Sequence, residues 1–418
     1  MKEIRITDLA QPELSEFQQQ AIAFGETLET SFDPQGILDD ARAATGLDDF
    51  GPMDFLERLS VICDEWDSDQ GLNGIGRMGL RGRLLTHTKN RLLVHDLLKR
   101  HSEIHDIKIE KPIIVAGLPR SGTTHLLNLM AADSRLRAMP FWESAEPVPN
   151  PLEAPGEDGV DPRYKRSADA WEMMQQTVPL LGAMHPQDPD HINEEIELMQ
   201  PNFGSYNYEW YSYSPRWRDY YLAMDQLPHY EYMLTLIKVL QFQQPADQPT
   251  RWVLKSPMHL ENLPVLQQVF PDATYVVTHR DPVSVIQSTL TMLCYGQRMN
   301  RHAVLIEEMR DYWTDRIEHL LRACVRDRPS MPEERTIDVP FHEFMADDMG
   351  MLARIYAKTD LPFDDKAKAE MQAYIDAHPR GKDGKLVYDL AGDFGADPAA
   401  LRERFRFYFD AVPARPEA

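Results

Sequence analysis

The sequence is poor in cysteine and contains no long apolar run. Its 418 residues include three cysteines, Cys63, Cys294 and Cys324, which form no Cys-x-x-Cys pattern. Scattered cysteines in odd number are typical of reduced thiols in a cytosolic protein. No segment approaches the roughly 18 consecutive apolar residues of a membrane-spanning helix, and the charged start at residues 1–5 is followed by no apolar stretch. We therefore expect a cytoplasmic protein with neither a signal peptide nor a transmembrane segment.

Basic residues are also scarce relative to acidic ones. The chain has 44 Lys and Arg against 67 Asp and Glu, a formal net charge of −23. An acidic surface repels DNA, RNA and anionic membranes, so we expect no nucleic-acid partner. Any anionic ligand must then bind at a local group of Arg and Lys side chains. The composition, 43% hydrophobic and 27% charged, is that of a globular protein with a large core.

The most informative segment lacks the lysine of an ATPase loop. It reads Gly-Leu-Pro-Arg-Ser-Gly-Thr-Thr over residues 117–124, after an apolar run at 113–116 and before a helical apolar pattern at 125–130. A glycine-rich turn between a strand and a helix offers backbone N–H groups and the helix dipole to an anion. Thr123 stands where an ATPase has lysine, and Arg120 supplies a cation instead. The segment predicts an anion site without ATP or GTP hydrolysis, with a simple helix-opening turn as the alternative.

Short apolar segments alternate with helical patterns along the rest of the chain. We expect strands at 113–117, 252–255, 274–279 and 336–341, and helices at about 265–269, 283–293 and 304–324. Buried strands that alternate with helices indicate a parallel sheet covered on both faces. The sequence thus predicts an α/β fold, a P-loop-like parallel sheet flanked by helices, with ligands beyond the carboxyl ends of the strands.

Two further helical regions are expected around this core. Apolar residues recur at helical spacing in residues 1–108, which predicts an N-terminal helical layer. Residues 150–248 are acidic and then aromatic, and they are too long for a loop, so we expect a mainly helical insertion. Its aromatic side chains are interpreted as subdomain core, with a wall for an apolar substrate as the alternative. The α/β core then spans 109–390, and residues 391–418 form a C-terminal helix and tail.

Cations recur where the predicted strands end. Lys255 ends one strand, and His259 follows four residues later, a plausible electrophilic cation and general base. Arg280 ends the next strand, and Ser288 lies about two helical turns beyond it. An arginine can hold a phosphate with two hydrogen bonds, and a hydroxyl can add a third. The segment His-Pro-Arg-Gly-Lys at 378–382 is either an exposed turn or a further clamp on an anion.

Taken together, these segments resemble the sulfotransferases that use 3′-phosphoadenosine 5′-phosphosulfate (PAPS). The loop is similar to the 5′-phosphosulfate loop of that family, with Arg120 in the place of its lysine. Arg280 and Ser288, eight residues apart, resemble its 3′-phosphate pair, and Lys255 resembles its catalytic lysine. The loop at Arg380 resembles a late Arg-Lys-Gly loop with altered order. The variants found here look most like the bacterial branch called the sulfotransferase-3 family.

The resemblance implies a PAPS-dependent sulfotransferase. Such an enzyme moves a sulfuryl group to an acceptor hydroxyl by in-line displacement, and PAP is the product. The aromatic insertion and the acidic surface favour an apolar small-molecule or lipid acceptor. The resemblance implies catalytic roles for Arg120, Lys255 and His259. It also implies donor-binding roles for Pro119, Arg120, Ser121, Gly122, Thr123, Thr124, Arg280, Ser288, Arg380, Gly381 and Lys382. We expect no metal, because the sequence has no His-Glu-x-x-His motif, and His185, His191 and Glu194 are interpreted as loop residues.

The identity of the general base stays open between His259 and a glutamate of the insertion, Glu194, Glu195 or Glu197. Many relatives carry histidine two residues after the lysine, where this chain has Pro257, and His259 is the nearest histidine. Other branches use a glutamate, which makes an insertion glutamate such as Glu194 the second candidate. The acidic segment 191–197 is, however, interpreted as a solvated helix face.

Two other classes of protein also stay open. A P-loop kinase would use the same loop, although Thr123 in place of lysine counts against it. A non-catalytic carrier would leave the cations at 120, 255 and 280 idle, and burying idle cations is costly.

Overall fold

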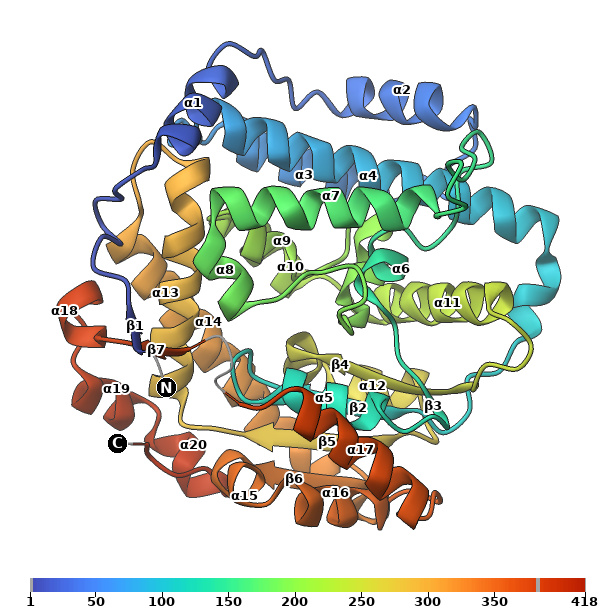
Figure 1. Ribbon diagram of the computed structural model, residues 1–418, viewed down its shortest axis with the longest axis vertical. Helices are drawn as coiled ribbons and strands as arrows, with labels where there is room; N and C mark the ends of the chain where they lie inside the picture. Colours follow the sequence, from blue (N-terminus) through green and yellow to red (C-terminus); the bar gives the residue numbers. More distant parts are fainter. Residues whose placement is uncertain (1–2, 381–383, 418) are drawn as a thin grey trace.

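A five-stranded parallel sheet lies between two helical layers (Figure 1). The computed structural model describes residues 3–380 and 384–417. The strand order is β3-β4-β2-β5-β6, and every neighbouring pair is parallel. The strands are β2 (Ile113–Gly117), β3 (Leu136–Arg137), β4 (Arg251–Ser256), β5 (Thr274–His279) and β6 (Thr336–Pro340). The predicted P-loop-like α/β fold is confirmed, and the four predicted strands are β2, β4, β5 and β6.

The side chains of the strands alternate between two hydrophobic cores. Successive residues of a strand point to opposite faces of its sheet. In β2, Ile113 and Val115 belong to the smaller core, whereas Ile114 and Ala116 belong to the larger one. The smaller core is closed by α5 (Thr123–Ala131), α16 (Asp348–Tyr356) and α17 (Asp365–Ala377). A strand buried on both faces reads as a continuous apolar run, which is why β2 was visible in the sequence.

The larger core joins the N-terminal helices and the insertion to the other face of the sheet. The N-terminal helices are α1 (Glu16–Gly25), α2 (Pro34–Thr45), α3 (Phe55–Asp67), α4 (Gly74–Arg100) and the 3₁₀ turn η1 (Ser102–Asp106). The next elements are α6 (Phe141–Ala145), α7 (Pro162–Thr177), α8 (Pro179–Met184), η2 (Glu195–Asn202), α9 (Tyr208–Tyr211), α10 (Pro215–Ala223) and α11 (Leu227–Gln243). Tyr206, Tyr208, Trp217, Tyr221 and Tyr230 are at most 1% exposed. These five aromatic side chains are therefore core residues, as the sequence pattern favoured.

The C-terminal part contributes the remaining elements. They are η3 (Pro257–Glu261), α12 (Leu263–Val269), α13 (Pro282–Asn300), α14 (Ile306–Asp327), η4 (Arg328–Ser330), η5 (Glu333–Arg335), α15 (Phe341–Ala346), α18 (Leu390–Phe394), α19 (Pro398–Arg404) and α20 (Arg406–Ala411). A separate parallel pair joins β1 (Glu3–Arg5) to β7 (Lys385–Val387). The sequence did not predict these strands, because three residues are too few to show a period. Within the described ranges, no helix has the length and apolar character required to cross a bilayer.

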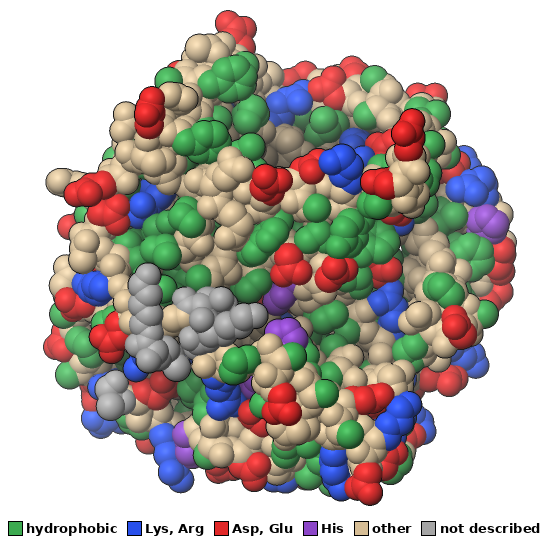
Figure 2. Space-filling view, in the orientation of Figure 1, with side chains coloured by type: hydrophobic (Ala, Val, Ile, Leu, Met, Phe, Trp, Pro, Cys, Tyr) green, Lys and Arg blue, Asp and Glu red, His purple; other side chains and the backbone are tan. Residues whose placement is uncertain are grey.

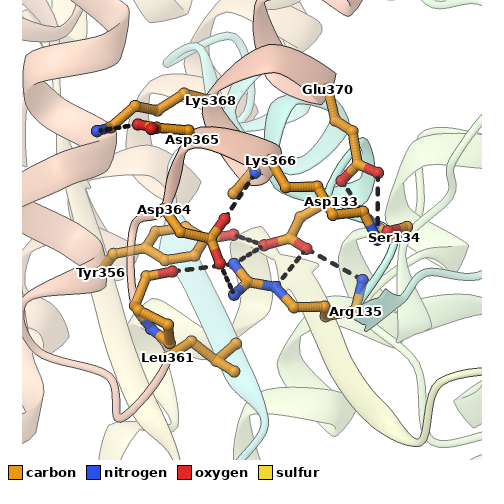
Figure 3. Close-up of polar contacts among 12 residues, drawn as sticks. Asp133, Ser134, Arg135, Tyr356, Leu361, Asp364, Asp365, Lys366, Lys368 and Glu370 are labelled. Carbon is orange, nitrogen blue, oxygen red and sulfur yellow. Dashed lines mark hydrogen bonds and ion pairs between the residues drawn. The ribbon is translucent and has the colours of Figure 1, made fainter.

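A polar network fixes the segment after α5 against α16 and α17 (Figure 3). Arg135 donates to both carboxylate oxygens of the buried Asp133, at 2.9 and 2.7 Å, and to Asp364 at 3.1 Å. The hydroxyl of Tyr356 donates to the same Asp133 carboxylate at 2.7 Å. Hydrogen bonds to a buried charge are stronger than neutral ones. The network therefore holds the start of α17 beside the end of the helix that begins at the glycine-rich loop.

Candidate active site

The glycine-rich loop joins β2 to the start of α5, as the sequence predicted. A Cβ at Gly117 would lie 1.8 Å from Oγ1 of Thr278, so only glycine fits at this end of β2. Gly122 and Arg120 have φ angles of 83° and 63°, in the left-handed region. The Ser121 hydroxyl donates to the Leu118 carbonyl at 2.5 Å and lies 3.0 Å from Oγ1 of Thr278. A non-glycine residue held in this conformation is strained, and such strain is often found at functional sites.

The first turn of α5 is open to an anion. Gly122 is the N-cap residue and has no side chain, so no side-chain cap bonds the first N–H groups of α5 within the described chain. Such groups need a partner, and the helix dipole favours an anionic one. The loop therefore offers backbone donors at the end of the central strand.

Arg120, Arg280 and Ser288 meet on one side of this loop. Nε of Arg120 donates to the Ser288 hydroxyl at 3.0 Å, and its Nη1 bonds the Met184 carbonyl. Nη1 of Arg280 donates to the carbonyl of Arg120. The structure thus brings together three residues that are up to 168 positions apart in the chain. Arg280 forms its ion pair with Glu417, and the neighbouring Asp281 caps α13 instead.

Lys255 reaches the other side of the loop from the end of β4. Its side chain is 3% exposed. The ammonium Nζ lies 3.3 Å from Oγ1 of Thr124, in the first turn of α5, and it forms an ion pair with Glu194. A buried ammonium needs such partners, because an unpaired charge is costly to bury. A cation, a carboxylate and the start of the loop helix therefore meet at one point.

His259 does not lie where a general base would face this point. It is completely buried, and both of its ring nitrogens are engaged. Nε2 lies 2.5 Å from Oε1 of Glu195, and Nδ1 lies 2.9 Å from the Tyr230 hydroxyl. An ionised carboxylate only accepts hydrogen bonds, so Nε2 is the donor to Glu195, and in a neutral imidazole Nδ1 is then the acceptor from Tyr230.

The acidic segment before η2 is not a solvated helix face, and that interpretation is wrong. Glu195 is completely buried, and the Glu194 side chain is only 17% exposed. Burial raises the pKa of Glu197 to about 7, and the neighbouring Glu194 adds to the shift. The sequence favoured a solvated face because acidic residues usually lie in water. Here a long-range ion pair with Lys255 overrides that preference.

His185 and His191 also lie near the cations, although they looked like ordinary loop residues. Burial lowers the pKa of His185 to about 3, with further lowering by Lys255 and Arg120. Burial likewise lowers the pKa of His191 to about 4, with a contribution from Lys255. Figure 2 shows histidine side chains gathered in a hollow between the upper helices and the lower α/β part of this face. Within the described residues, no three His, Cys, Asp or Glu side chains are grouped to hold a metal ion.

Arg380 lies beside the first turn of α5. Its guanidinium donates to the Met345 carbonyl at 2.9 Å, forms an ion pair with Asp348 and lies 3.3 Å from Nε2 of His125. His125 belongs to the first turn of α5, so Arg380 does return to the helix that follows the loop. Gly381 and Lys382, which the sequence also assigned to donor binding, lie outside the described residues.

The fold and this site define a transferase of the P-loop-like α/β class. A model of the sulfotransferase family matches residues 112–365, which is more than half of the chain. The chain therefore belongs to the sulfotransferase family, as the resemblance to its sulfotransferase-3 branch predicted, and it is a transferase enzyme. A search of curated proteins gave no match.

Two solved structures resemble the whole chain. Sulfotransferase STF9 from Mycobacterium avium is 26% identical, with a TM-score of 0.81, and the match covers 94% of this chain and 99% of that one. Sulfotransferase STF1 from Mycobacterium tuberculosis H37Rv is also 26% identical, with a TM-score of 0.75 and coverage of 89% and 97%. The similarity extends well beyond residues 112–365, so the N-terminal helices belong to the shared architecture.

Proposed function

We propose that this enzyme transfers a sulfuryl group from PAPS to the hydroxyl of a small-molecule acceptor. The observation that carries the proposal is the meeting of Lys255, Glu194 and the start of α5 at the glycine-rich loop. A cation there can neutralise a leaving oxygen, and a carboxylate beside it can accept a proton. A P-loop nucleotide site and a catalytic pair are thus next to each other.

The residues around the loop fit a donor that carries two anionic ends. The uncapped N-terminus of α5 and Arg120 would hold the 5′-phosphosulfate, and Arg280 with Ser288 would hold the 3′-phosphate. Pro119, Ser121, Thr123 and Thr124 complete the loop, and Arg380 lies beside it. On a chain of net charge −23, such a concentration of cations is the local exception that a polyanion requires.

When bound, the donor supplies a sulfur–oxygen bond that is activated for displacement. We assign the role of base to Glu194, which accepts the hydroxyl proton as the acceptor oxygen bonds to sulfur. Lys255 then neutralises the phosphate oxygen that is released as the old sulfur–oxygen bond breaks. Positioning and charge neutralisation are the main contributions of a protein to such an in-line transfer. His259 has no role in this proton transfer, because Glu195 and Tyr230 already engage its ring nitrogens.

The proposed acceptor is uncharged or apolar, including a lipid alcohol. An acidic surface attracts no polyanionic acceptor, and Glu197 near the proposed base is shielded from water enough for its pKa to rise. We also propose a reducing, cytoplasmic setting, because Cys63, Cys294 and Cys324 are all unpaired thiols buried in the core.

Calorimetric titration with PAP, ADP and ATP tests the donor assignment. We expect PAP to bind far more tightly than ADP or ATP, since only PAP carries a 3′-phosphate. Arg280→Ala should weaken PAP binding by about 10- to 100-fold, which corresponds to the usual free-energy contribution of a hydrogen bond to a charged group. The control Arg322→Ala removes an exposed arginine that pairs with Glu318, and it should bind as wild type does. Equal binding of ATP would favour a kinase, and no nucleotide binding would favour a carrier.

A further inference from the structure

Two adjacent glutamates hold Lys255 in different ways. Glu194 pairs with the side-chain ammonium, whereas Oε2 of Glu195 accepts the backbone N–H of Lys255 at 2.7 Å. Both glutamates come from the start of η2, and Lys255 comes from β4. Glu195 therefore fastens the insertion to the carboxyl end of a core strand, next to the proposed catalytic pair.

The second carboxylate oxygen of Glu195 is fixed as well. It accepts from Nε2 of His259 at 2.5 Å, and Nδ1 of His259 is hydrogen-bonded to the Tyr230 hydroxyl at 2.9 Å. Glu195, His259 and Tyr230 are all completely buried. A buried carboxylate with a charge-assisted bond at each oxygen cannot shift without leaving a donor unpaired. The chain from Tyr230 to Lys255 therefore holds Glu195 in one position.

We propose that Glu195 is a positioning residue for the transfer reaction. Its carboxylate, locked by His259 and Tyr230, sets the place of the adjacent Glu194 against the Lys255 ammonium. This inference rests on the proposed roles of Glu194 and Lys255. It also gives His259 a function, since this histidine orients a carboxylate and does not meet the acceptor. A misplacement of about 1 Å is enough to cost roughly 100-fold in rate.

The test is Glu195→Asp, which keeps the charge but shortens the side chain by one methylene. We expect kcat to fall about 100-fold, with the Kd for PAP within about twofold of wild type. In the Glu194→Gln background the same change should lower kcat less than about threefold, because the base that Glu195 positions is already gone. The matched control is Glu65→Asp, since Glu65 is buried and also accepts a backbone N–H, from Trp217 at 2.9 Å. It should leave kcat unchanged.

Equal losses of kcat in both backgrounds would overturn the proposal, as would no loss in either. If Glu195→Asp does not fold, Glu195→Gln replaces it, because the amide can accept from Lys255 and donate to neutral His259. That variant should lose less than about fivefold in kcat. A loss as large as that of Glu194→Gln would show that charge, and not position, is what Glu195 contributes. If Glu194→Gln itself has no effect on kcat, Glu194 is not the general base, and it is the proposed function that fails.

A second inference rests on the opposite end of the nucleotide site. The Glu417 carboxylate accepts from Nε and Nη2 of Arg280, at 2.7 and 2.8 Å. The guanidinium lies over the Phe341 ring, 3.9 Å from its centroid. Two parallel hydrogen bonds to one anionic group are also how an arginine holds a phosphate. Glu417 therefore takes the bonds that the proposed 3′-phosphate needs.

The backbone of Glu417 is held in place too. Its N–H donates to Oδ2 of Asp281 at 2.8 Å, and its carbonyl accepts from Nη2 of Arg402 at 2.5 Å. Asp281 is buried and also pairs with Arg402. The tail is thus docked through main-chain contacts, and its carboxylate is directed at Arg280.

We infer that Glu417 is a displaceable latch that competes with the 3′-phosphate of the donor for Arg280. This inference also rests on the proposed donor. Calorimetry should show that Glu417→Gln binds PAP about 10-fold more tightly than wild type, with no change for AMP, which has no 3′-phosphate. The control Glu403→Gln removes an exposed carboxylate of the neighbouring helix α19, and it should bind PAP as wild type does.

If the wild type binds PAP and Glu417→Gln binds it equally or more weakly, the latch proposal is overturned while the donor assignment stands. If neither protein binds PAP, the donor assignment fails and the latch fails with it.

Discussion

Replacing Glu197 by glutamine should stabilise the protein, and more so at alkaline pH. Glu197 is in the first turn of η2, next to the proposed base Glu194, and Asn207 donates to its carboxylate at 2.9 Å. Burial raises its pKa from 4.5 to about 7. The folded state therefore keeps a proton that the unfolded chain releases. A glutamine can still accept from Asn207, but it carries no charge at any pH.

The sign and size of the effect follow from proton linkage. For an acid whose pKa is raised on folding, the penalty is absent well below pH 4.5, grows as pH rises to 7 and is constant above it. A pKa difference of about 2.5, at 1.36 kcal/mol per pKa unit, gives a full penalty of about 3 kcal/mol. At pH 5.5 the same relation gives about 1.4 kcal/mol. Glu197→Gln should be more stable than wild type by these amounts.

Equilibrium urea unfolding at pH 5.5, 6.5 and 8.0 measures the difference. The control is Glu231→Gln, which removes an exposed carboxylate from α11 and should follow the wild type at each pH. The expected result is a stability gain for Glu197→Gln that grows by about 2 kcal/mol between pH 5.5 and 8.0. A gain that does not depend on pH would refute the argument, because it would arise from packing and not from the titration of Glu197.

Four further outcomes are expected. Lys255→Met should lower kcat by about 100- to 1,000-fold in a sulfuryl-transfer assay, because it removes the cation that neutralises charge in the transition state. The affinity for PAP, measured by calorimetry, should stay within a few-fold of wild type. Weaker PAP binding with normal kcat would contradict this. Glu194→Gln should lower kcat by about 100- to 10,000-fold, and full activity would exclude it as the base. Gly117→Ala should abolish measurable PAP binding, because its Cβ would lie 1.8 Å from Thr278, and wild-type affinity would show that the loop can adjust. Arg135→Ala should cost about 3 kcal/mol in urea unfolding, since it leaves a buried aspartate charge poorly paired, and a change below 0.5 kcal/mol would show that Tyr356 suffices.

The sequence by itself determined four of the five strands of the sheet and the glycine-rich loop. Strands β2, β4, β5 and β6 lie where apolar runs predicted them, because a strand buried on both faces must be apolar throughout. The loop was visible because Gly117 and Gly122 have local requirements, a close approach to Thr278 and a positive φ angle. Such requirements act within a few residues of chain, so a pattern of sequence can express them.

The tertiary structure alone decided how the charged residues are used. Glu194 and Glu195 look like ordinary solvated acids, and their roles arise from Lys255 and His259, 61 and 64 residues away. Glu417 meets Arg280 across 137 residues. The energetic contribution of a charged side chain depends on its desolvation and on its partners in space, and the neighbouring sequence specifies neither. Local patterns could therefore predict where the site lies, whereas only the folded chain shows which carboxylate faces which cation.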